Sequence, residues 1–198
     1  RWALKSVLLL YVLKQNKKVI YVDNDIYFFN DYSFLEEELN ENAIILTPHF
    51  YPSNPKKSQT WLEANHRIGL FNAGFIGVNR NAMSALEWWS DCTIYEIKKA
   101  YWRGLFDDQK YLDLFPVLFD GVKIIKHRGC NFAGWNSNSN IDLNQIVFVH
   151  FNSFTLNKFK NLDNEYYPLF TLYVEQLKVF NPTFEENGRG LSLFKLQN

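Results

Sequence analysis

The chain has few cysteines and no apolar run long enough to cross a membrane. Its two cysteines, Cys92 and Cys130, lie far apart without metal-ligand spacing, and two are too few for a disulfide scaffold. The apolar run at residues 7–13 lies between Lys5 and Lys14, so it is too short to span a bilayer, and it shows no cleavage-site pattern. These absences predict a protein of the reducing cytoplasm, without a transmembrane segment.

Neither sign of charge is in excess. The 21 Lys and Arg residues balance the 21 Asp and Glu residues, and the sequence pI is about 7.1. Without a broad basic field the chain is not expected to bind nucleic acid, so an anionic substrate must be held locally, by a metal ion or by backbone N–H groups. The 198 residues, 47% of them hydrophobic and 18% aromatic, are enough for one domain with a substantial core.

Short apolar runs alternate with amphipathic stretches along the chain. Continuous β-branched and aromatic runs indicate buried strands, and these are expected at residues 19–22, 43–46, 75–78, 122–125 and 147–149. Helices are expected at residues 2–15, 36–39, 81–101, 107–115 and 166–180, with loops at residues 48–57 and 131–140. The alternation predicts an α/β fold with a mixed, mostly parallel sheet flanked by helices, of the Rossmann-like kind. We expect one domain over residues 1–182 and a C-terminal tail over residues 183–198.

The chain opens inside the first expected helix, in which Leu4, Leu8, Tyr11 and Val12 share one face. An α/β nucleotide-binding domain normally begins with a strand that supplies its first ligand contacts. We therefore expect the domain to lack its N-terminal strands.

Asp23 and Asp25 follow the strand expected at residues 19–22. At positions i and i+2 their carboxylates leave the same face of an extended chain, and open α/β sheets bind ligands at the carboxyl ends of their strands. Two carboxylates so close repel each other unless a cation lies between them. Hard oxygen ligands favour Mg²⁺ or Mn²⁺, which complete their shells with substrate phosphates. The alternative is a polar turn in which the carboxylates cap backbone N–H groups.

His150 ends the strand expected at residues 147–149 much as Asp23 ends its own. Both side chains could therefore reach one rim of the sheet, where a neutral imidazole would complete an Asp/Asp/His ligand set. The alternative is a histidine at the surface or in a structural hydrogen bond.

Three further segments carry groups suited to sugar recognition. In the segment at residues 72–74, Asn-Ala-Gly, the small residues admit a ligand close to the backbone and the amide offers hydrogen bonds; a tight turn is the alternative. The pair Asp108-Gln109 could bind sugar hydroxyls or stabilise positive charge at an anomeric carbon; the alternative is that Asp107 or Asp108 caps a helix. The loop at residues 129–136 could stack Trp135 on a sugar ring or use it to fill the core.

Taken in order, these segments resemble those of bacterial GT-A-type glycosyltransferases, the nucleotide-diphospho-sugar transferases with an Asp-X-Asp motif. The resemblance covers residues 5–182. It is carried by the segments at residues 19–25, 45–49, 71–78, 88–89, 108–113, 129–136 and 149–151.

The resemblance implies a hexosyltransferase-type glycosyltransferase with a GT-A-like fold. Such an enzyme transfers a sugar from a nucleotide-diphosphate sugar to an acceptor, here an unknown glycan, lipid or protein, and the related enzymes retain the anomeric configuration. Asp23, Asp25 and His150 match residues that hold Mn²⁺ or Mg²⁺, and Asp108 and Gln109 match a pair near the anomeric carbon. Residues implied in donor binding are Asp23, Asn24, Asn72, Ala73, Gly74, Asn131 and Trp135.

One departure from the family pattern follows His150. Related enzymes often have a glycine two or three residues on and a lysine beyond it that grips the diphosphate, whereas here the next residues are Phe-Asn-Ser-Phe and the nearest lysine is Lys158. This departure favours a second hypothesis, a catalytically incomplete sugar- or nucleotide-binding module of a larger protein. A metal-dependent phosphatase or nucleotidyltransferase is a third, but it would not need the Asn-Ala-Gly and Asp-Gln segments in this order.

Overall fold

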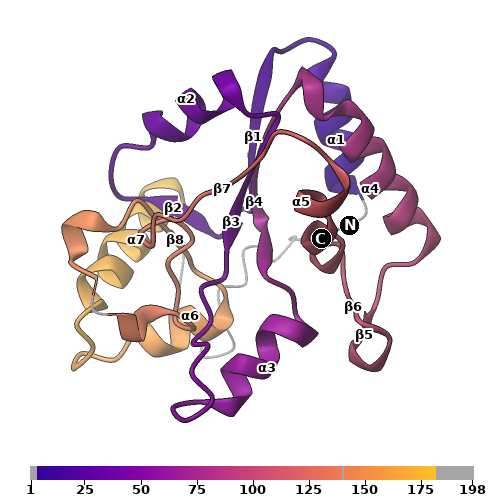
Figure 1. Cartoon of the computed structure of the whole chain (residues 1–198). Coiled ribbons are helices and arrows are strands. Elements are labelled where there is room, and N and C mark those ends of the chain that lie inside the picture. Colours follow the sequence, from indigo (N-terminus) through magenta and orange to yellow (C-terminus); the bar gives the residue numbers. More distant parts are fainter. Residues whose placement is uncertain (1–3, 140, 182–198) are drawn as a thin grey trace, which may run out of the picture.

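A four-stranded sheet forms the centre of the computed structural model, which describes residues 4–139 and 141–181 (Figure 1). Its spatial order is β1 (Lys18–Val22), β4 (Phe71–Asn79), β3 (Ile44–Pro48) and β7 (Val122–Ile124). The strand β4 runs antiparallel to both of its neighbours, while β3 and β7 are parallel. Three of the four strands therefore share one direction, which confirms the mixed, mostly parallel sheet that the sequence predicts.

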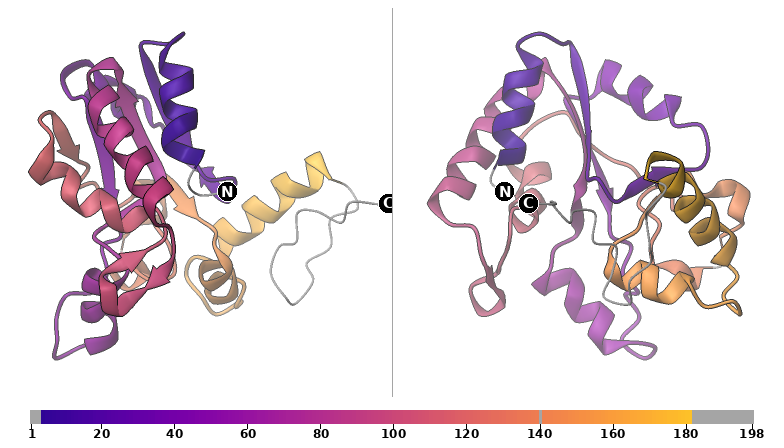
Figure 2. Two further views of the ribbon diagram at one scale, coloured as in Figure 1. Left: turned by 90° about the vertical axis from the view of Figure 1, so that its right-hand side faces the viewer. Right: turned by 180° about the vertical axis from the view of Figure 1, so that it is seen from behind.

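Helices cover both faces of this sheet (Figures 1 and 2). On one face α1 (Leu4–Leu13) packs against α4 (Met83–Tyr95), and Leu9 and Trp89 join the core there. On the other face α2 (Ser33–Glu41) inserts Leu35. Side chains of a strand alternate between faces, so Phe75 of β4 joins the α2 side and Ile76 joins the α1 side.

A smaller, aromatic-rich unit lies beside the carboxyl end of β1. It consists of β2 (Ile26–Phe28), β8 (Phe148–His150), α6 (Ser153–Phe159) and α7 (Tyr167–Phe180). The strands β2 and β8 are antiparallel, with Ile26 opposite His150. Stacked rings join the residue after β8 to α7, since Phe151 and Tyr173 have centroids 4.1 Å apart and planes 5° from parallel. This unit fixes His150 next to the chain that leaves β1.

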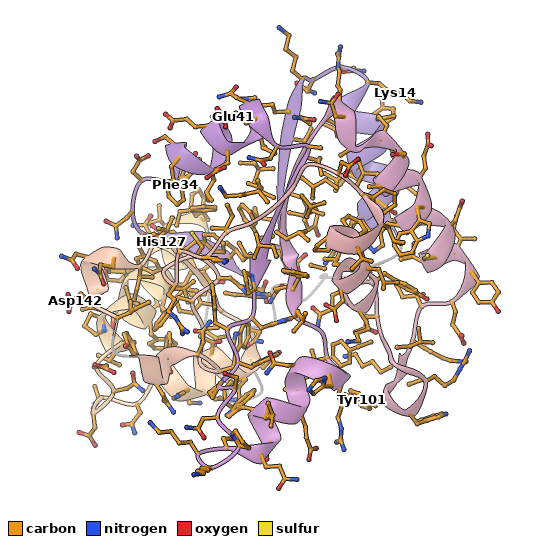
Figure 3. All side chains as sticks on the ribbon, in the orientation of Figure 1. Lys14, Phe34, Glu41, Tyr101, His127 and Asp142 are labelled. Carbon is orange, nitrogen blue, oxygen red and sulfur yellow. The ribbon has the colours of Figure 1, made fainter. Side chains whose placement is uncertain are left out.

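Several short elements have no counterpart in the sequence prediction. The strands β2, β5 (Lys99–Ala100) and β6 (Leu105–Phe106) contain two or three residues, too few to show a period of two. The helix expected at residues 81–101 ends at Tyr95, and its last part forms the β5–β6 hairpin that carries Tyr101 (Figure 3). Two helices were also missed, α3 (Gln59–Arg67), which begins after the capping residue Ser58, and α6.

The prediction of one helix over residues 107–115 is wrong. Residues Gln109–Leu114 form the 3₁₀ helix η3, and a separate α-helix, α5 (Phe115–Leu118), follows it. Asp107 has a φ of 47°, in the left-handed region, which prevents a helix from starting there. Pro116 has no N–H with which to continue an α-helical ladder, so the α5 turn begins anew around it.

The tail expected at residues 183–198 lies outside the described residues. Within residues 4–139 and 141–181, no helix has the length and apolar character needed to cross a membrane. Cys92 and Cys130 are both free thiols.

Gly77 of β4 is a position where the core leaves no room for a side chain. A Cβ atom at Gly77 would lie 2.5 Å from Cγ1 and 2.7 Å from Cδ1 of Ile45, which is fully buried. We expect Gly77→Ala to lower the free energy of unfolding by about 1–3 kcal/mol because the neighbouring strands must shift. Urea unfolding followed by circular dichroism measures this change.

The Ile45→Ala replacement removes both clashing atoms. The double variant Gly77→Ala/Ile45→Ala should therefore lose less stability than the sum of the two single variants, and strict additivity would contradict the close contact. Gly104→Asn is the control, because nothing lies within 4 Å of the position that a Cβ atom would take there and Asn tolerates the φ of 68°.

Candidate functional site

The Asp23-Asn24-Asp25 triplet forms the turn between β1 and β2. Backbone hydrogen bonds hold both of its ends: Asp23 N–H donates to the Gly74 carbonyl at 2.7 Å, and the Asp25 carbonyl accepts from Phe151 N–H at 2.7 Å. The first bond continues the β1–β4 pairing and the second continues the β2–β8 pairing. The acidic turn is therefore fixed where the two sheets meet.

The side chains of Asp23, Asp25 and His150 converge, as the sequence predicts. One ligand atom from each residue lies within 4.8 Å of the others. His150 Nε2 lies 3.1 Å from Asp25 Oδ1, and the carboxylate side chains of Asp23 and Asp25 are 24% and 31% exposed. The cluster therefore presents two solvent-accessible carboxylates and one imidazole nitrogen to the same point.

Hydrogen bonds fix the orientation of the His150 ring. Asn72 Oδ1 accepts from Gly74 N–H at 2.6 Å, so the amide nitrogen of Asn72 faces His150 Nδ1 at 3.2 Å. That amide nitrogen can only donate, so in this arrangement Nδ1 accepts and the N–H of Nε2 points toward Asp25. A Cβ atom at position 74 would lie 2.7 Å from His150 Cε1, so glycine is required there to admit the imidazole.

The environment of Asp25 favours its ionised form. Burial would raise the pKa of Asp25, but the hydrogen bond and the positive potential from His150, with a weaker contribution from Lys5, outweigh burial and lower that pKa below its ordinary value. The neighbouring His49 is different: burial and proximity to His150 lower the pKa of His49 to about 3. His49 is therefore neutral and adds no positive charge to the site.

Lys5 of α1 belongs to the site, although the sequence did not lead us to it. Its side chain is 6% exposed, and its ammonium lies 3.2 Å from Asp23 Oδ1, 3.3 Å from Asp108 Oδ2 and 3.0 Å from the Ala73 carbonyl. The Tyr21 hydroxyl donates to Asp23 Oδ1 at 2.6 Å, and the Tyr21 ring faces the ammonium. A buried cation thus links α1, β1 and the start of η3.

The helical spacing of Lys5 could have indicated its burial from the sequence. Lys5 is spaced by four residues from Leu9, which places both on one helix face, and a lysine on a buried face needs a charged partner. The apolar residues grouped from the sequence lie on the opposite face, where Leu4, Leu8 and Tyr11 are 63%, 49% and 61% exposed.

The structure places Asp108 and Gln109 in different surroundings. Asp108 is 3% exposed, and burial raises the pKa of its carboxyl even though the Lys5 ammonium opposes this. Its side chain makes no capping hydrogen bond at the start of η3, so Asp108 does not act as a helix cap. Gln109 is half-buried and donates to the Ile68 carbonyl at 3.2 Å.

Asn131 and Trp135 are buried. Asn131 is fully buried with a φ of 59°, and its amide donates to the Pro48 carbonyl at 3.0 Å. Trp135 is 6% exposed, donates to the His49 carbonyl at 2.8 Å and presents its ring edge-on to His150 at 5.7 Å. This packing favours the interpretation in which Trp135 fills the core behind the site.

A cavity of about 560 Å³ adjoins the acidic turn. Its lining residues are Lys5, Tyr21, Val22, Asp23, Asn24, Asp25 and Ile26. The ammonium of Lys158, the first lysine after His150, donates instead to the Gly134 carbonyl at 2.9 Å and to Asn138 at 3.0 Å. The ammonium that lines the cavity therefore comes from α1, and the other polar groups come from β1 and the acidic turn.

The chain is similar in sequence to two curated bacterial proteins. No protein-family profile matches the chain. It is 29% identical over 173 residues to the uncharacterized protein YfnF of Bacillus subtilis (strain 168) and 29% identical over 172 residues to the uncharacterized protein YfnD of the same strain. Each match covers 78% of this chain but only 56% and 53% of the relative, so the chain spans about half the length of these curated relatives.

One solved structure shows the fold. It is the crystal structure of a glycosyltransferase involved in the glycosylation of the major capsid of PBCV-1. The match has a TM-score of 0.51 and 15% sequence identity, and it covers 77% of this chain and 69% of that chain. The chain therefore has the fold of that glycosyltransferase.

Removing the imidazole should change the titration of Asp25. In His150→Ala, the burial that raises the pKa of Asp25 remains while the main opposing group is lost, so this pKa should rise. Carbon-13 NMR titration of the carboxyl groups measures it. Asp31 is the internal control, since hydrogen bonds from Ser33 lower its pKa and should be unaffected.

The same pair predicts a pH dependence of stability. A carboxyl group whose pKa is lowered by folding stabilises the protein above its unfolded pKa, and this contribution disappears as the pH falls through the folded pKa. The stability difference between the wild type and His150→Ala should therefore shrink below about pH 4. A difference that is constant from pH 7 to pH 3 would contradict the pairing.

Breaking the buried ion pair should destabilise the fold. Lys5→Met leaves the Asp108 carboxylate buried without its cation, a change that typically costs about 3 kcal/mol. Chemical unfolding of Lys5→Met and of Lys5→Met/Asp108→Asn separates this effect from lost packing, because the second variant removes the uncompensated charge. We expect the double variant to be the more stable one, and the opposite order would show that the ion pair does not matter.

Proposed function

We propose that this chain provides the metal and donor site of a metal-dependent glycosyltransferase. The substrate would be a nucleotide-diphosphate sugar, and a hexosyl group would pass to a glycan, lipid or protein acceptor with retention of anomeric configuration. The observation that carries the proposal is the convergence of Asp23, Asp25 and His150 beside a cavity of about 560 Å³. The fold shared with a glycosyltransferase supports it.

The residues present fit a divalent cation of the Mg²⁺ or Mn²⁺ kind. Asp25 is ionised at neutral pH, and carboxylate oxygens with one imidazole nitrogen suit Mn²⁺ in particular. When ionised, the three carboxylates of Asp23, Asp25 and Asp108 outweigh the single ammonium of Lys5 by two charges. A divalent cation would balance that excess, and the open cavity leaves space for phosphate oxygens to complete its shell.

In the proposed reaction a bound cation supplies Lewis-acid neutralisation of the departing diphosphate. Asp23, Asp25 and His150 would hold that ion, and Asn72 would orient the His150 ring through Nδ1. Lys5 would keep a second positive charge at the wall of the cavity, where it is positioned by Asp108.

The remaining assignments concern the sugar. Ala73 and Gly74 bring backbone close to the cluster, since their carbonyls bond to Lys5 and to the Asp23 N–H. Gln109 is proposed for the face of the sugar at which the leaving group departs, with Asp108 acting through Lys5. Asn24 is exposed at the acidic turn and is proposed as a donor contact. Asn131 and Trp135 would act by shaping the wall behind His150.

A sugar- or nucleotide-binding module without its own catalytic activity is the second candidate. One observation favours it: the ammonium of Lys158, the first lysine after His150, bonds to Gly134 and Asn138. Such a module would use the same ligands for the cation and the diphosphate. The two candidates therefore differ in turnover and agree on binding.

Replacing one carboxylate tests the proposal. Asp25→Asn keeps the shape of the side chain but removes a charged ligand, so Mn²⁺ affinity should fall at least about tenfold and donor hydrolysis should be lost. Titration with Mn²⁺ followed by electron paramagnetic resonance, alone and with UDP or GDP, measures binding. Hydrolysis of nucleotide-diphosphate sugars measures turnover.

Asp31→Asn is the matched control, because Asp31 bonds to Ser33 and Tyr32 outside the cluster. It should bind Mn²⁺ as the wild type does. Unchanged Mn²⁺ binding in Asp25→Asn would refute the metal site, and wild-type binding without hydrolysis of any donor would favour the module.

A further inference from the structure

The two buried tyrosines of the α7 segment differ in what their hydroxyl groups contact. Tyr173, on the inward face of α7, is 3% exposed, and its hydroxyl oxygen is buried without a hydrogen-bond partner among the described residues. The hydroxyl of Tyr166, the residue before α7, instead reaches the Ile141 carbonyl at 3.5 Å. A buried hydroxyl without a partner lowers the stability of a fold, so packing alone does not explain a tyrosine at position 173.

Aromatic contacts hold the ring of Tyr173 without using its oxygen. The ring stacks on Phe151 with centroids 4.1 Å apart, and it meets Tyr27 in an edge contact at 5.9 Å. Phenylalanine supplies other rings of the same buried cluster, such as Phe159 and Phe170. A phenylalanine at position 173 would therefore keep these contacts. Because the ring is held on a face and at an edge, the direction of its hydroxyl is fixed.

The same contacts place Tyr173 beside Asp25. Phe151, on which the ring stacks, donates its backbone N–H to the Asp25 carbonyl at 2.7 Å. Burial raises the pKa of Tyr173 to about 12, and the negative charge of Asp25 contributes to that rise. The hydroxyl therefore lies within electrostatic reach of the Asp25 carboxylate. It keeps its proton at neutral pH and can donate a hydrogen bond.

The Asp25 carboxylate is oriented by His150 in this structure. His150 Nε2 lies 3.1 Å from Asp25 Oδ1, and the other oxygen, Oδ2, takes no part in this contact. If Nε2 became a ligand of a cation, it would stop donating to Oδ1, because one nitrogen cannot both donate a proton and bind an ion. Asp25 would then need another donor to fix the orientation of its carboxylate.

Tyr173 can supply that donor only through Asp25. Asp25 lines the cavity of about 560 Å³ and its side chain is 31% exposed, whereas Tyr173 does not line the cavity. A phosphate or sugar held in the cavity would meet the carboxylate and not the tyrosine. The hydroxyl is therefore suited to positioning a ligand of the cation and not to contact with the substrate.

We propose that Tyr173 is a positioning residue for a divalent cation held by Asp23, Asp25 and His150. Its hydroxyl donates to the Asp25 carboxylate when His150 changes from a donor into a ligand, and so fixes the orientation of that carboxylate. The bond also gives a partner to a hydroxyl that has none among the described residues. This inference rests on the proposed metal site and extends it to α7.

The test compares the wild-type chain with Tyr173→Phe, which removes one oxygen atom and keeps the ring. Titration with Mn²⁺ alone, followed by electron paramagnetic resonance, should show an affinity lower by about tenfold or more, the usual effect of losing an outer-shell partner. Urea unfolding in EDTA should give a midpoint at least as high as that of the wild type, because the variant no longer buries an unpaired hydroxyl. A purely structural role would lower the urea midpoint.

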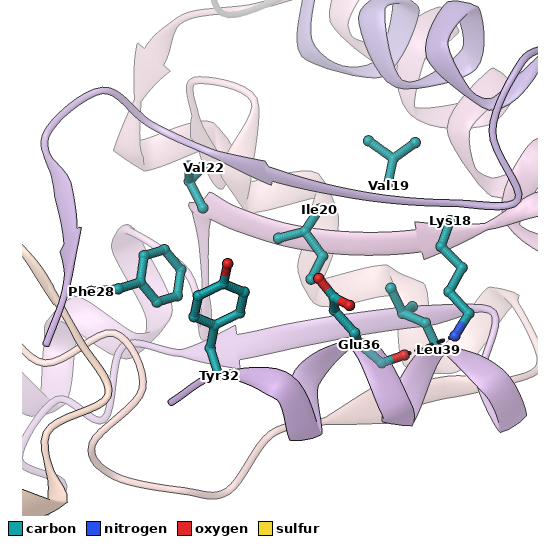
Figure 4. A pocket seen from close by; sticks show the side chains of 8 residues that line it. All are labelled: Lys18, Val19, Ile20, Val22, Phe28, Tyr32, Glu36 and Leu39. Carbon is teal, nitrogen blue, oxygen red and sulfur yellow. Dashed lines mark hydrogen bonds between the residues drawn. The ribbon is translucent and has the colours of Figure 1, made fainter. Parts of the chain in front are cut away.

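Tyr32→Phe is the matched control, because it removes the same atom from the same type of residue. Tyr32 is 43% exposed and lines a groove of about 420 Å³ between β1 and α2 (Figure 4). None of Asp23, Asp25 and His150 lines this groove. Tyr32→Phe should therefore bind Mn²⁺ as the wild type does, and an equal loss of affinity in both variants would contradict a specific role of Tyr173.

The remaining outcomes separate this inference from the proposed function. Equal Mn²⁺ affinity of the wild type and Tyr173→Phe would overturn the inference and leave the metal site in place. A lower urea midpoint of Tyr173→Phe in EDTA would also overturn it, because the hydroxyl would then serve the fold. A wild-type chain that does not bind Mn²⁺ would refute the metal site itself, and the inference with it.

Discussion

Hydrogen bonding from three consecutive residues of β4 connects every part of the candidate site. The Asn72 amide orients His150, the Ala73 carbonyl accepts from the Lys5 ammonium, and the Gly74 carbonyl accepts from the backbone N–H that begins the acidic turn. These residues can make such contacts only because β4 is hydrogen-bonded to strands on both sides and buried along nearly its whole length. The geometry of the cluster thus depends on the register of the central sheet more than on the turn itself.

Electrostatic balance is the second constraint. A lysine with a 6% exposed side chain persists in α1 because the carboxylates of Asp23 and Asp108 lie within 3.3 Å of it. The pairing leaves Asp25 with His150 as its main partner, in an orientation that lowers the pKa of Asp25. The site therefore separates its carboxylates by role. Asp108 is buried against the Lys5 ammonium, Asp23 contacts both that ammonium and the cavity, and Asp25 is the most exposed of the three.

Much of this arrangement could be predicted from the sequence, because its signals are local. The strands at residues 19–22 and 75–78 are continuous apolar runs, and Asp23, Asp25 and His150 each stand at a strand end. The remainder depends on tertiary contacts. Lys5 finds its partners Asp23 and Asp108 far along the chain, and the indole of Trp135 is held by the His49 carbonyl. Two-residue strands such as β5 exist only because a partner strand lies beside them.

The position of the proton on His150 has a consequence for the Asn72 side chain beside it. An ion that takes the lone pair of Nε2 obliges the ring proton to move to Nδ1, where it would face the amide nitrogen of Asn72, donor against donor. The Asn72 side chain must then turn its oxygen toward the ring and release the Gly74 N–H that it now holds at 2.6 Å. Binding of such an ion to the cluster would therefore require this one amide to flip. The flip would leave the buried N–H of Gly74, within β4, without its present acceptor, which is a cost that ion binding would have to offset.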